Sequence, residues 1–381
     1  MNRRTFFAAA GASLVAVSAA GAGAFALTRT PSAALASWDT AGDADDPRLR
    51  AFEFAILAPN PHNRQPWLIE LIGDDAAFVY CDLTKRLPET DPFDRQITIG
   101  FGCFLELLRL AAADGGYALT VMPFPDGEPE PRLDQRPIAH IRFQRNDGQP
   151  REPLFAHARK RRSNKEPFDT GRPVATAALQ QLARADDDVA VATTADTDQV
   201  AALRDLTWRA HLLESTTPRT LMESVRLMRI GKAEIEANPD GIDLGGPMLE
   251  VLKAVGLLTR DSLADPTSTA FAQGLDMYRA IMGTAMAYIW VATPGNRRLD
   301  QLAAGRAWLR LNLQATALGI ALHPISQALQ EFAEMEPLYD DLAGRLLPPG
   351  QARVQMLGRL GYGVEVDPSP RWPLDHAMKG R

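Results

Sequence analysis

The feature that most constrains the fold is an internal repeat of one helix and the strand that follows it. Gly102 and Gly116 bracket an apolar segment that is followed by Tyr-Ala-Leu. Gly305 and Gly319 bracket a second segment at the same spacing, followed by Ile-Ala-Leu, and each copy has a proline a few residues later. Apolar residues at helical spacing that are closed by glycine predict a helix and then a strand. The repeat therefore indicates a chain of two similar halves.

The length and composition of the chain are compatible with two similar halves. The chain has 381 residues, of which 46% are hydrophobic and 23% are charged, as in ordinary globular proteins. Its formal net charge of −6 repels phosphate backbones, so no nucleic-acid partner is expected. The six histidines show no paired spacing and no CxxC occurs, so no metal site is predicted. Cys103 lies in an apolar run and is expected to be a buried thiol, and nothing demands a disulfide with Cys81.

The first 36 residues have the pattern of an export signal. Arg3 and Arg4 precede a Phe pair, a moderately apolar stretch follows over residues 8–27, and Ala34-Leu35-Ala36 is a candidate cleavage site. The adjacent arginines resemble a twin-arginine signal, for which a general secretory signal or an uncleaved anchor helix is the alternative. We expect export to the periplasm or another extracytoplasmic space, with membrane anchoring if the signal is not cleaved.

The remaining sequence predicts a mixed α+β fold. An acidic linker is expected over residues 37–47, and the two halves over 48–150 and 151–381. Helices are predicted over 49–57, 97–113, 154–162, 174–185, 197–213, 219–237, 297–318 and 329–346. Strands are predicted over 67–72, 76–83, 117–123, 138–143, 189–194, 287–295, 319–324 and 353–362.

Two polar segments are candidates for chemistry. The loop APNPHNRQPW, residues 58–67, offers amide and imidazole groups that can read the edge of a planar heterocycle, although proline and asparagine are also ordinary turn residues. The segment RRSNK, residues 161–165, offers guanidinium, hydroxyl and ammonium groups suited to a phosphate, although on pattern alone a solvated helix end is the simpler interpretation.

Together these segments resemble the nitroreductase family of flavin enzymes. The family's Arg-x-Ser-x-Arg/Lys motif is matched by Arg161-Arg162-Ser163-Asn164-Lys165, then Phe168, and its Ala-Pro-Ser-x-x-Asn-x-Gln-Pro-Trp motif by residues 58–67. A helix ending in Leu-Gly, then a strand and Pro-Ile, is matched by residues 318–327, and a final strand with a trailing basic residue by LGRLGYG and Arg371. The resemblance implies two halves, each with a mainly antiparallel sheet flanked by helices.

The order of the motifs departs from the family. In an ordinary member the Arg-x-Ser-x-Lys motif comes first, whereas here it follows the Asn-x-Gln-Pro-Trp motif, and each half has what the other lacks. The family is typically a homodimer with two flavins at its interface. A tandem, fused branch of it would form an intramolecular pseudo-dimer with one complete site. The resemblance assigns FMN contacts to Arg161, Ser163, Lys165, Pro324, Ile325, Ser326, Gln327 and Arg371 in the second half and to Pro59, Asn60, Pro61 and Asn63 in the first.

The resemblance implies an exported FMN-dependent oxidoreductase that reduces a quinone, a nitro-aromatic or a similar small-molecule acceptor. Ser326 and Gln327 replace an acidic residue and a glycine that are common in the family, and a quinol or a redox protein is the expected donor. The alternatives are a non-catalytic flavin-binding or flavin-sequestering protein and an anion-binding module without flavin. Residues 222–260 fit an insertion that is either a lid over the flavin or a packing decoration. No catalytic residue is predicted, and the fused chain is expected to be a monomer.

Overall fold

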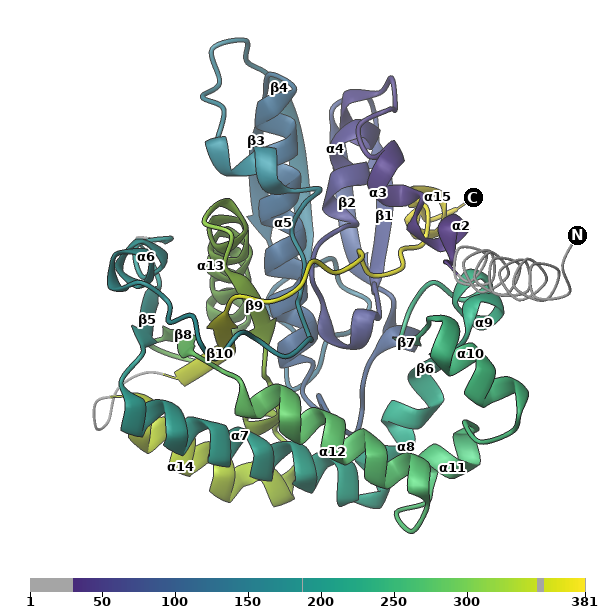
Figure 1. Ribbon diagram of the computed structural model, residues 1–381. Coiled ribbons are helices and arrows are strands. Elements are labelled where there is room, and N and C mark those ends of the chain that lie inside the picture. The colour runs from purple at the N-terminus through teal and green to yellow at the C-terminus, as the bar shows by residue number, and fades with distance from the viewer. Residues whose placement is uncertain (1–29, 187, 348–352, 381) are drawn as a thin grey trace, which may run out of the picture.

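The computed structural model describes residues 30–186, 188–347 and 353–380, so most of the predicted export signal lies outside the described residues (Figure 1). Two four-stranded sheets have the strand orders β1-β2-β4-β3 and β5-β8-β10-β9, and every neighbouring pair in them is antiparallel. The strands are β1 (Trp67–Ile72), β2 (Ala76–Cys81), β3 (Tyr117–Pro123), β4 (Ala139–Arg145), β5 (Ala190–Thr194), β8 (Ala287–Thr293), β9 (Ala321–Pro324) and β10 (Arg353–Gly361).

The two sheets are built from the same succession of elements. Along the first half, two strands precede helix α5 (Arg95–Asp114) and two strands follow it; along the second half, β5 and β8 precede helix α13 (Arg298–Ala317), and β9 and β10 follow it. Each sheet places its last strand third in the order, so β1, β2, β3 and β4 correspond to β5, β8, β9 and β10. The two sheets therefore have the same strand order, and both are antiparallel.

Helices α5 and α13 lie side by side at the centre of the molecule (Figure 1) and touch at the repeated glycines. A Cβ built on Gly102 would lie 2.9 Å from Cα of Gly305, and one built on Gly305 would lie 2.8 Å from Cα of Gly102. Each would also collide with a backbone carbonyl of the opposite helix, at Leu302 and Ile99. One hydrophobic core joins both halves around this crossing. Helix α5 is apolar and long enough to span a membrane, but it is almost wholly buried in this core.

Helices α7, α12 and α14 lie by the second sheet, and helices α8 to α11 lie beside the first sheet (Figure 1). Helices α7 (Thr197–Thr216) and α14 (Glu336–Leu346) enclose a second core cluster, and α12 (Thr269–Gly283) packs on α7 (Figure 1). The remaining helices and the small parallel sheet are α4 (Pro47–Ala55), α6 (Thr176–Leu182), α8 (Pro218–Leu227), β6 (Met228–Ile230), α9 (Lys232–Ala237), β7 (Ile242–Leu244), α10 (Pro247–Ala254), α11 (Arg260–Ala264) and α15 (Leu374–Ala377).

The residues before α4 pack against the chain's C-terminal segment. Helices α2 (Ser32–Leu35) and α3 (Ser37–Thr40) cover part of the first half, and Trp38 is buried. The indole nitrogen of Trp38 donates to the Ser369 carbonyl at 2.9 Å, and the Ala34 carbonyl accepts from the Arg371 backbone N–H at 2.8 Å. The candidate cleavage site at residues 34–36 therefore lies in ordered, packed chain.

Three predicted helices are wrong in extent. The prediction over 154–162 yields only the 3₁₀ turn η3 (Pro153–His157) and a further turn to Lys160. The helix does not continue, because Arg161 is buried and the Asn164 N–H pairs with the Leu322 carbonyl. The prediction over 219–237 breaks at β6, where Gly231 has a φ of 79°. The prediction over 329–346 begins late, at α14, and is preceded by the 3₁₀ turns η4 (Gln327–Leu329) and η5 (Ala333–Met335).

Candidate functional site

The loop at residues 58–67 has an unusual backbone. His62, Asn63 and Gln65 have φ values of 47°, 51° and 50°, a left-handed region that side chains other than glycine enter at a cost of roughly 1–3 kcal/mol each. The Asn60 carboxamide oxygen accepts from the Gln65 backbone N–H at 2.8 Å and closes the turn, which the 3₁₀ turn η1 (Pro61–Asn63) spans. Such strain persists only where surrounding contacts fix the chain, so the loop is held in one shape.

Two arginines from the second half reach this loop. The guanidinium of Arg161 donates to the Leu57 carbonyl at 2.9 Å, and that of Arg371 donates to the same oxygen at 3.1 Å. Arg371 also donates to the Asn63 side-chain oxygen at 2.6 Å, while the Asn63 amide nitrogen donates to the Pro370 carbonyl. The motif residues that the sequence separates by about a hundred positions are therefore joined in space.

These two guanidiniums are buried without a salt bridge among the described residues. Both residues are 3% exposed, and among the described residues no carboxylate forms a salt bridge with either and each Nε lacks a hydrogen-bond partner. Burial lowers the pKa of Arg161 to about 10 and that of Arg371 to about 9, and the charge of Arg161 contributes to the second shift. Because isolated buried charges are costly, this arrangement favours an anion that accepts from both side chains.

Trp38 lies against this pair of arginines. The guanidinium carbons of Arg161 and Arg371 lie 5.7 Å and 5.3 Å from the centre of its ring, and that of Arg162 lies at 5.0 Å. An indole face attracts cations and keeps water away from them, which strengthens their interaction with an anion. Sequence reasoning missed Trp38 because it lies in the stretch interpreted as a linker, although a tryptophan is an unusual residue for a solvated linker.

The other predicted contacts lie along the same face. Asn164 is anchored beside β9 by its backbone N–H, which places Ser163 half-buried and Lys165 exposed on either side of it. Burial lowers the pKa of both His62, in the first-half loop, and His323, in β9, and the charge of Lys165 adds to both shifts. Burial is the larger cause in each histidine, and it lowers the pKa of His62 to about 4. Both imidazoles are therefore neutral near pH 7.

The end of β9 supplies the remaining predicted residues. Ile325 is buried, and its N–H donates to the Leu357 carbonyl of β10 at 2.8 Å. Ser326 and Gln327 follow at the half-buried start of η4, and the Gln327 side-chain oxygen is buried without a partner among the described residues.

A connected segment of residues 228–254, here called the strap, is fastened to the loop. The Gln65 side chain donates to the Pro239 carbonyl at 2.7 Å, and the Gly241 N–H donates to the Asn63 carbonyl at 3.2 Å. Asp240 is buried between them. Its carboxylate forms ion pairs with Arg64 at 3.1 Å, Lys85 at 2.7 Å and Arg229 at 2.7 Å. Sequence reasoning placed an insertion here but had no signal for this buried ion cluster.

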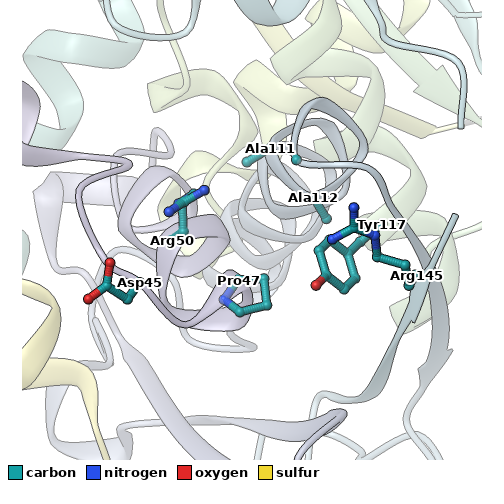
Figure 2. Close-up of a pocket in the computed structure, with 8 residues that line it drawn as sticks. Asp45, Pro47, Arg50, Ala111, Ala112, Tyr117 and Arg145 are labelled. Atoms are coloured by element: carbon teal, nitrogen blue, oxygen red, sulfur yellow. The ribbon is translucent and has the colours of Figure 1, made fainter. Parts of the chain in front are cut away.

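Two cavities lie away from these residues, and one of them, of about 540 Å³, is lined by Phe155 and Arg159. Figure 2 shows the other, of about 170 Å³, between the start of α4 and the junction of α5 with β3, where Asp45, Pro47, Arg50 and Tyr117 line it. Its volume is below the roughly 300–1,000 Å³ of small-molecule pockets. Among the described residues no group of His, Cys, Asp or Glu could hold a metal, and Cys81 and Cys103 are buried and free, as expected for Cys103.

Comparisons with known proteins give distant structural likenesses. No protein-family profile matches the sequence, and no curated protein matches it. The chain is similar to a nitroreductase with bound FMN from Bacteroides fragilis, at 14% identity over 57% of this chain and 91% of that one, with a TM-score of 0.32. An FMN-dependent nitroreductase from Mycobacterium smegmatis in complex with NADPH shares 17% identity over 58% and 95%, with a TM-score of 0.36. A putative nitroreductase from Anabaena variabilis shares 14% over 76% and 69%, with a TM-score of 0.35. The case for this chain's chemistry therefore rests on its own residues.

Proposed function

We propose that this chain is an FMN-binding oxidoreductase with a single flavin site shared between its halves. The observation that carries the proposal is the meeting of Arg161 and Arg371 at the first-half loop, where both are buried and neither forms a salt bridge among the described residues. A monoester phosphate is a dianion near neutral pH and matches two convergent guanidiniums in charge and in acceptor geometry. The motifs that meet there are those that the sequence resemblance assigns to the phosphate and to the ring.

The residues around this loop fit the two ends of the proposed cofactor. Arg161, Arg371 and Ser163 would hold the phosphate, with the two unpartnered Nε groups as donors. Lys165 would lie at the polar edge of the ring, and the loop of Asn60 and Asn63 would approach from the first half. When bound, FMN would supply transfer of electrons between a donor and an acceptor. The chain's own contribution is binding, orientation and exclusion of water.

We further propose that the two halves form an intramolecular pseudo-dimer and that the chain is a monomer. Matching strand orders and the reciprocal contact of Gly102 with Gly305 support this arrangement. A contact in which each copy presents the same position to the other is the signature of two-fold association. The site is single because only the second half supplies the two arginines and only the first supplies the loop.

A flavin-sequestering protein is the second candidate function. The strap favours it, because Pro239, Asp240 and Gly241 fix this segment to the loop of Asn63 and Gln65 through buried contacts. As a lid over the cofactor, the strap would restrict access for bulky acceptors. The small-molecule acceptor, a quinone or a nitro-aromatic, and the donor, a quinol or a redox protein, remain proposals, as does export through the twin-arginine pathway.

The absorption spectrum of the purified protein tests the cofactor. We expect a yellow protein that retains FMN through dialysis, and a colourless protein would contradict the proposal. After the bound flavin has been reduced, its reoxidation by quinones and by nitro-aromatics is measured against free FMN. Acceleration over free FMN supports the oxidoreductase, whereas retention without acceleration supports sequestration.

A further inference from the structure

Helix α10, at the end of the strap, turns its apolar face outward. Met248 and Val251 in this helix and Val255 and Leu257 just after it are 70%, 46%, 61% and 64% exposed. Positions 248, 251 and 255 share one face of a helix, because they are spaced three and four residues apart. A surface helix normally directs such a face to the core. These four side chains are here called the apolar stripe.

The two charged side chains of α10 are directed into the strap instead. Both are half-buried and lie on the face of the helix opposite the apolar stripe. Glu250 accepts from the Lys232 backbone N–H at 2.6 Å, and Lys253 donates to the Glu234 carboxylate at 2.8 Å. The helix thus covers its charges and exposes its apolar side chains. This reversal of the usual pattern is typical of a surface that a partner or a membrane covers.

The N-terminal segment of the chain joins the structure beside the strap. Helix α2 packs against α9, and both α9 and α10 pack against β6 (Figure 1). Residues 8–27, which precede the described chain, include no charged residue, and about 20 apolar residues suffice to cross a bilayer. Ala34, in the candidate cleavage site, is buried, and its carbonyl accepts from the Arg371 N–H. Packed chain is a poor protease substrate, which favours retention of the segment before it.

We propose that the apolar stripe is a membrane-contact surface, seated in the interface of a lipid bilayer that residues 8–27 enter beside it. Residues 8–27 are uncharged on every side, so packing them on the short stripe would leave much of their surface in water. A stable interface between two copies takes about 20–30 residues from each, far more than the stripe at residues 248–257 offers. A bilayer covers both apolar segments at once.

The charges around the stripe indicate which lipid is needed. Lys253 and Arg260 both form ion pairs with Glu234, at 2.8 Å and 2.6 Å. Paired cations attract anionic headgroups weakly, and insertion of apolar side chains does not depend on salt. We therefore expect the stripe to enter bilayers of uncharged lipid and to stay there at high salt.

The first test measures methionine oxidation in the full-length protein, reconstituted in phosphatidylcholine vesicles. Peroxide oxidises accessible methionines, and mass spectrometry quantifies each one. Met248 should be oxidised several-fold more slowly than Met122 of β3, although Met248 is the more exposed of the two in the folded chain. In Val251→Asp this protection should be lost, because a charged side chain resists transfer into lipid. Val364→Asp, at an exposed valine outside the stripe, should leave the protection unchanged. Equal oxidation of Met248 and Met122 in the natural protein would overturn the proposal.

The second test identifies what covers the stripe. Cys81 and Cys103 are buried, so a thiol-reactive fluorophore can be directed to Val255→Cys and, as the control, to Met122→Cys. Quenchers attached to lipid acyl chains should reduce the emission of the label at position 255 and not of the label at position 122. A label at 255 that is shielded from water but not quenched by these lipids would assign the stripe to residues 8–27. Shielding that disappears when the protein is diluted in lipid would assign it to a second copy. Either result would overturn the membrane contact, and neither test needs flavin, so both are independent of the proposed function.

Discussion

Arg161 and Arg371 donate to one acceptor, the carbonyl oxygen of Leu57, at 2.9 Å and 3.1 Å. The two positively charged side chains are buried next to each other. Among the described residues, they donate only to uncharged oxygens. Their mutual repulsion and their desolvation both oppose folding, and a bound anion would offset both. The first half contributes the acceptor and the second half the donors, so the site depends on how the halves meet.

Replacing one of these arginines should weaken FMN binding without lowering the stability of the FMN-free protein. In Arg161→Met we expect the free energy of unfolding without FMN to stay unchanged or to rise by about 1–4 kcal/mol, because an uncompensated buried charge is removed. The FMN dissociation constant should rise at least about tenfold, since a charge-assisted hydrogen bond contributes about 1.5–3 kcal/mol. Arg162→Met, at the half-buried neighbour, is the matched control and should change FMN binding less. An Arg161→Met protein that binds FMN as tightly as before would refute the anion site.

The contact between α5 and α13 at Gly102 and Gly305 should not tolerate a residue larger than glycine. Gly102→Ala places a methyl group against the Leu302 carbonyl and the Gly305 backbone, and neither backbone can yield without separating α5 from α13. We expect a loss of about 3 kcal/mol or more in denaturant unfolding. Gly274→Ala, on α12 with open space around it, is the control and should be neutral or slightly stabilising. Equal effects of the two substitutions would contradict the close contact of the helices.

The buried ion pairs of Asp240 in the strap should contribute more to the free energy of unfolding than an exposed ion pair does. Asp240→Asn leaves Arg64, Lys85 and Arg229 without their shared carboxylate, and breaking a buried pair costs about 3–5 kcal/mol. Urea unfolding measures this loss, and weaker FMN retention should accompany it because the cluster fastens the strap to the loop. Asp205→Asn, which removes an exposed partner of Arg209, should change stability little. A protein that loses no stability on Asp240→Asn would show that the strap is held by other contacts.

Glu214 is a residue of α7 that is 6% exposed, and burial raises its pKa, which predicts a pH-dependent stability difference. Its folded value of about 7 lies above the unfolded value of 4.5, so the folded chain binds more protons between those pH values and loses stability as the pH rises through them. Relative to Glu214→Gln, the natural protein should therefore lose roughly 3 kcal/mol between acid and pH 8. Comparing the two proteins cancels the opposite contribution of the buried histidines, whose lowered pKa values remove stability as the pH falls below 6.5. A difference that does not change with pH would contradict the buried, protonated carboxyl group.

Much of the fold follows from local sequence patterns. The strands predicted over 67–72 and 117–123 and the helices around Gly102 and Gly305 are confirmed, because alternating and helical hydrophobic periods with glycine stops determine them locally. The helix predicted over 154–162 is wrong because its conformation depends on long-range contacts, namely Arg161 with Leu57 and Asn164 with Leu322.

The site could be predicted only in part for the same reason. The convergence of Arg161, Arg371 and Asn63 is present, and it followed from motif order and resemblance rather than from charge alone. Trp38 and Asp240 were missed, because a buried indole or carboxylate far from any motif has no local signature. Their roles depend on partners on distant elements, and only the folded chain brings these together.

The stoichiometry of bound FMN tests the central claim most directly. Flavin is released from the purified protein and quantified against chain concentration, while the molar mass in solution is measured on the same sample. One site shared between two halves predicts one FMN per chain on a monomer, with retention lost in the double variant Arg161→Met/Arg371→Met. Two FMN per chain, or one FMN retained by that double variant, would contradict the account.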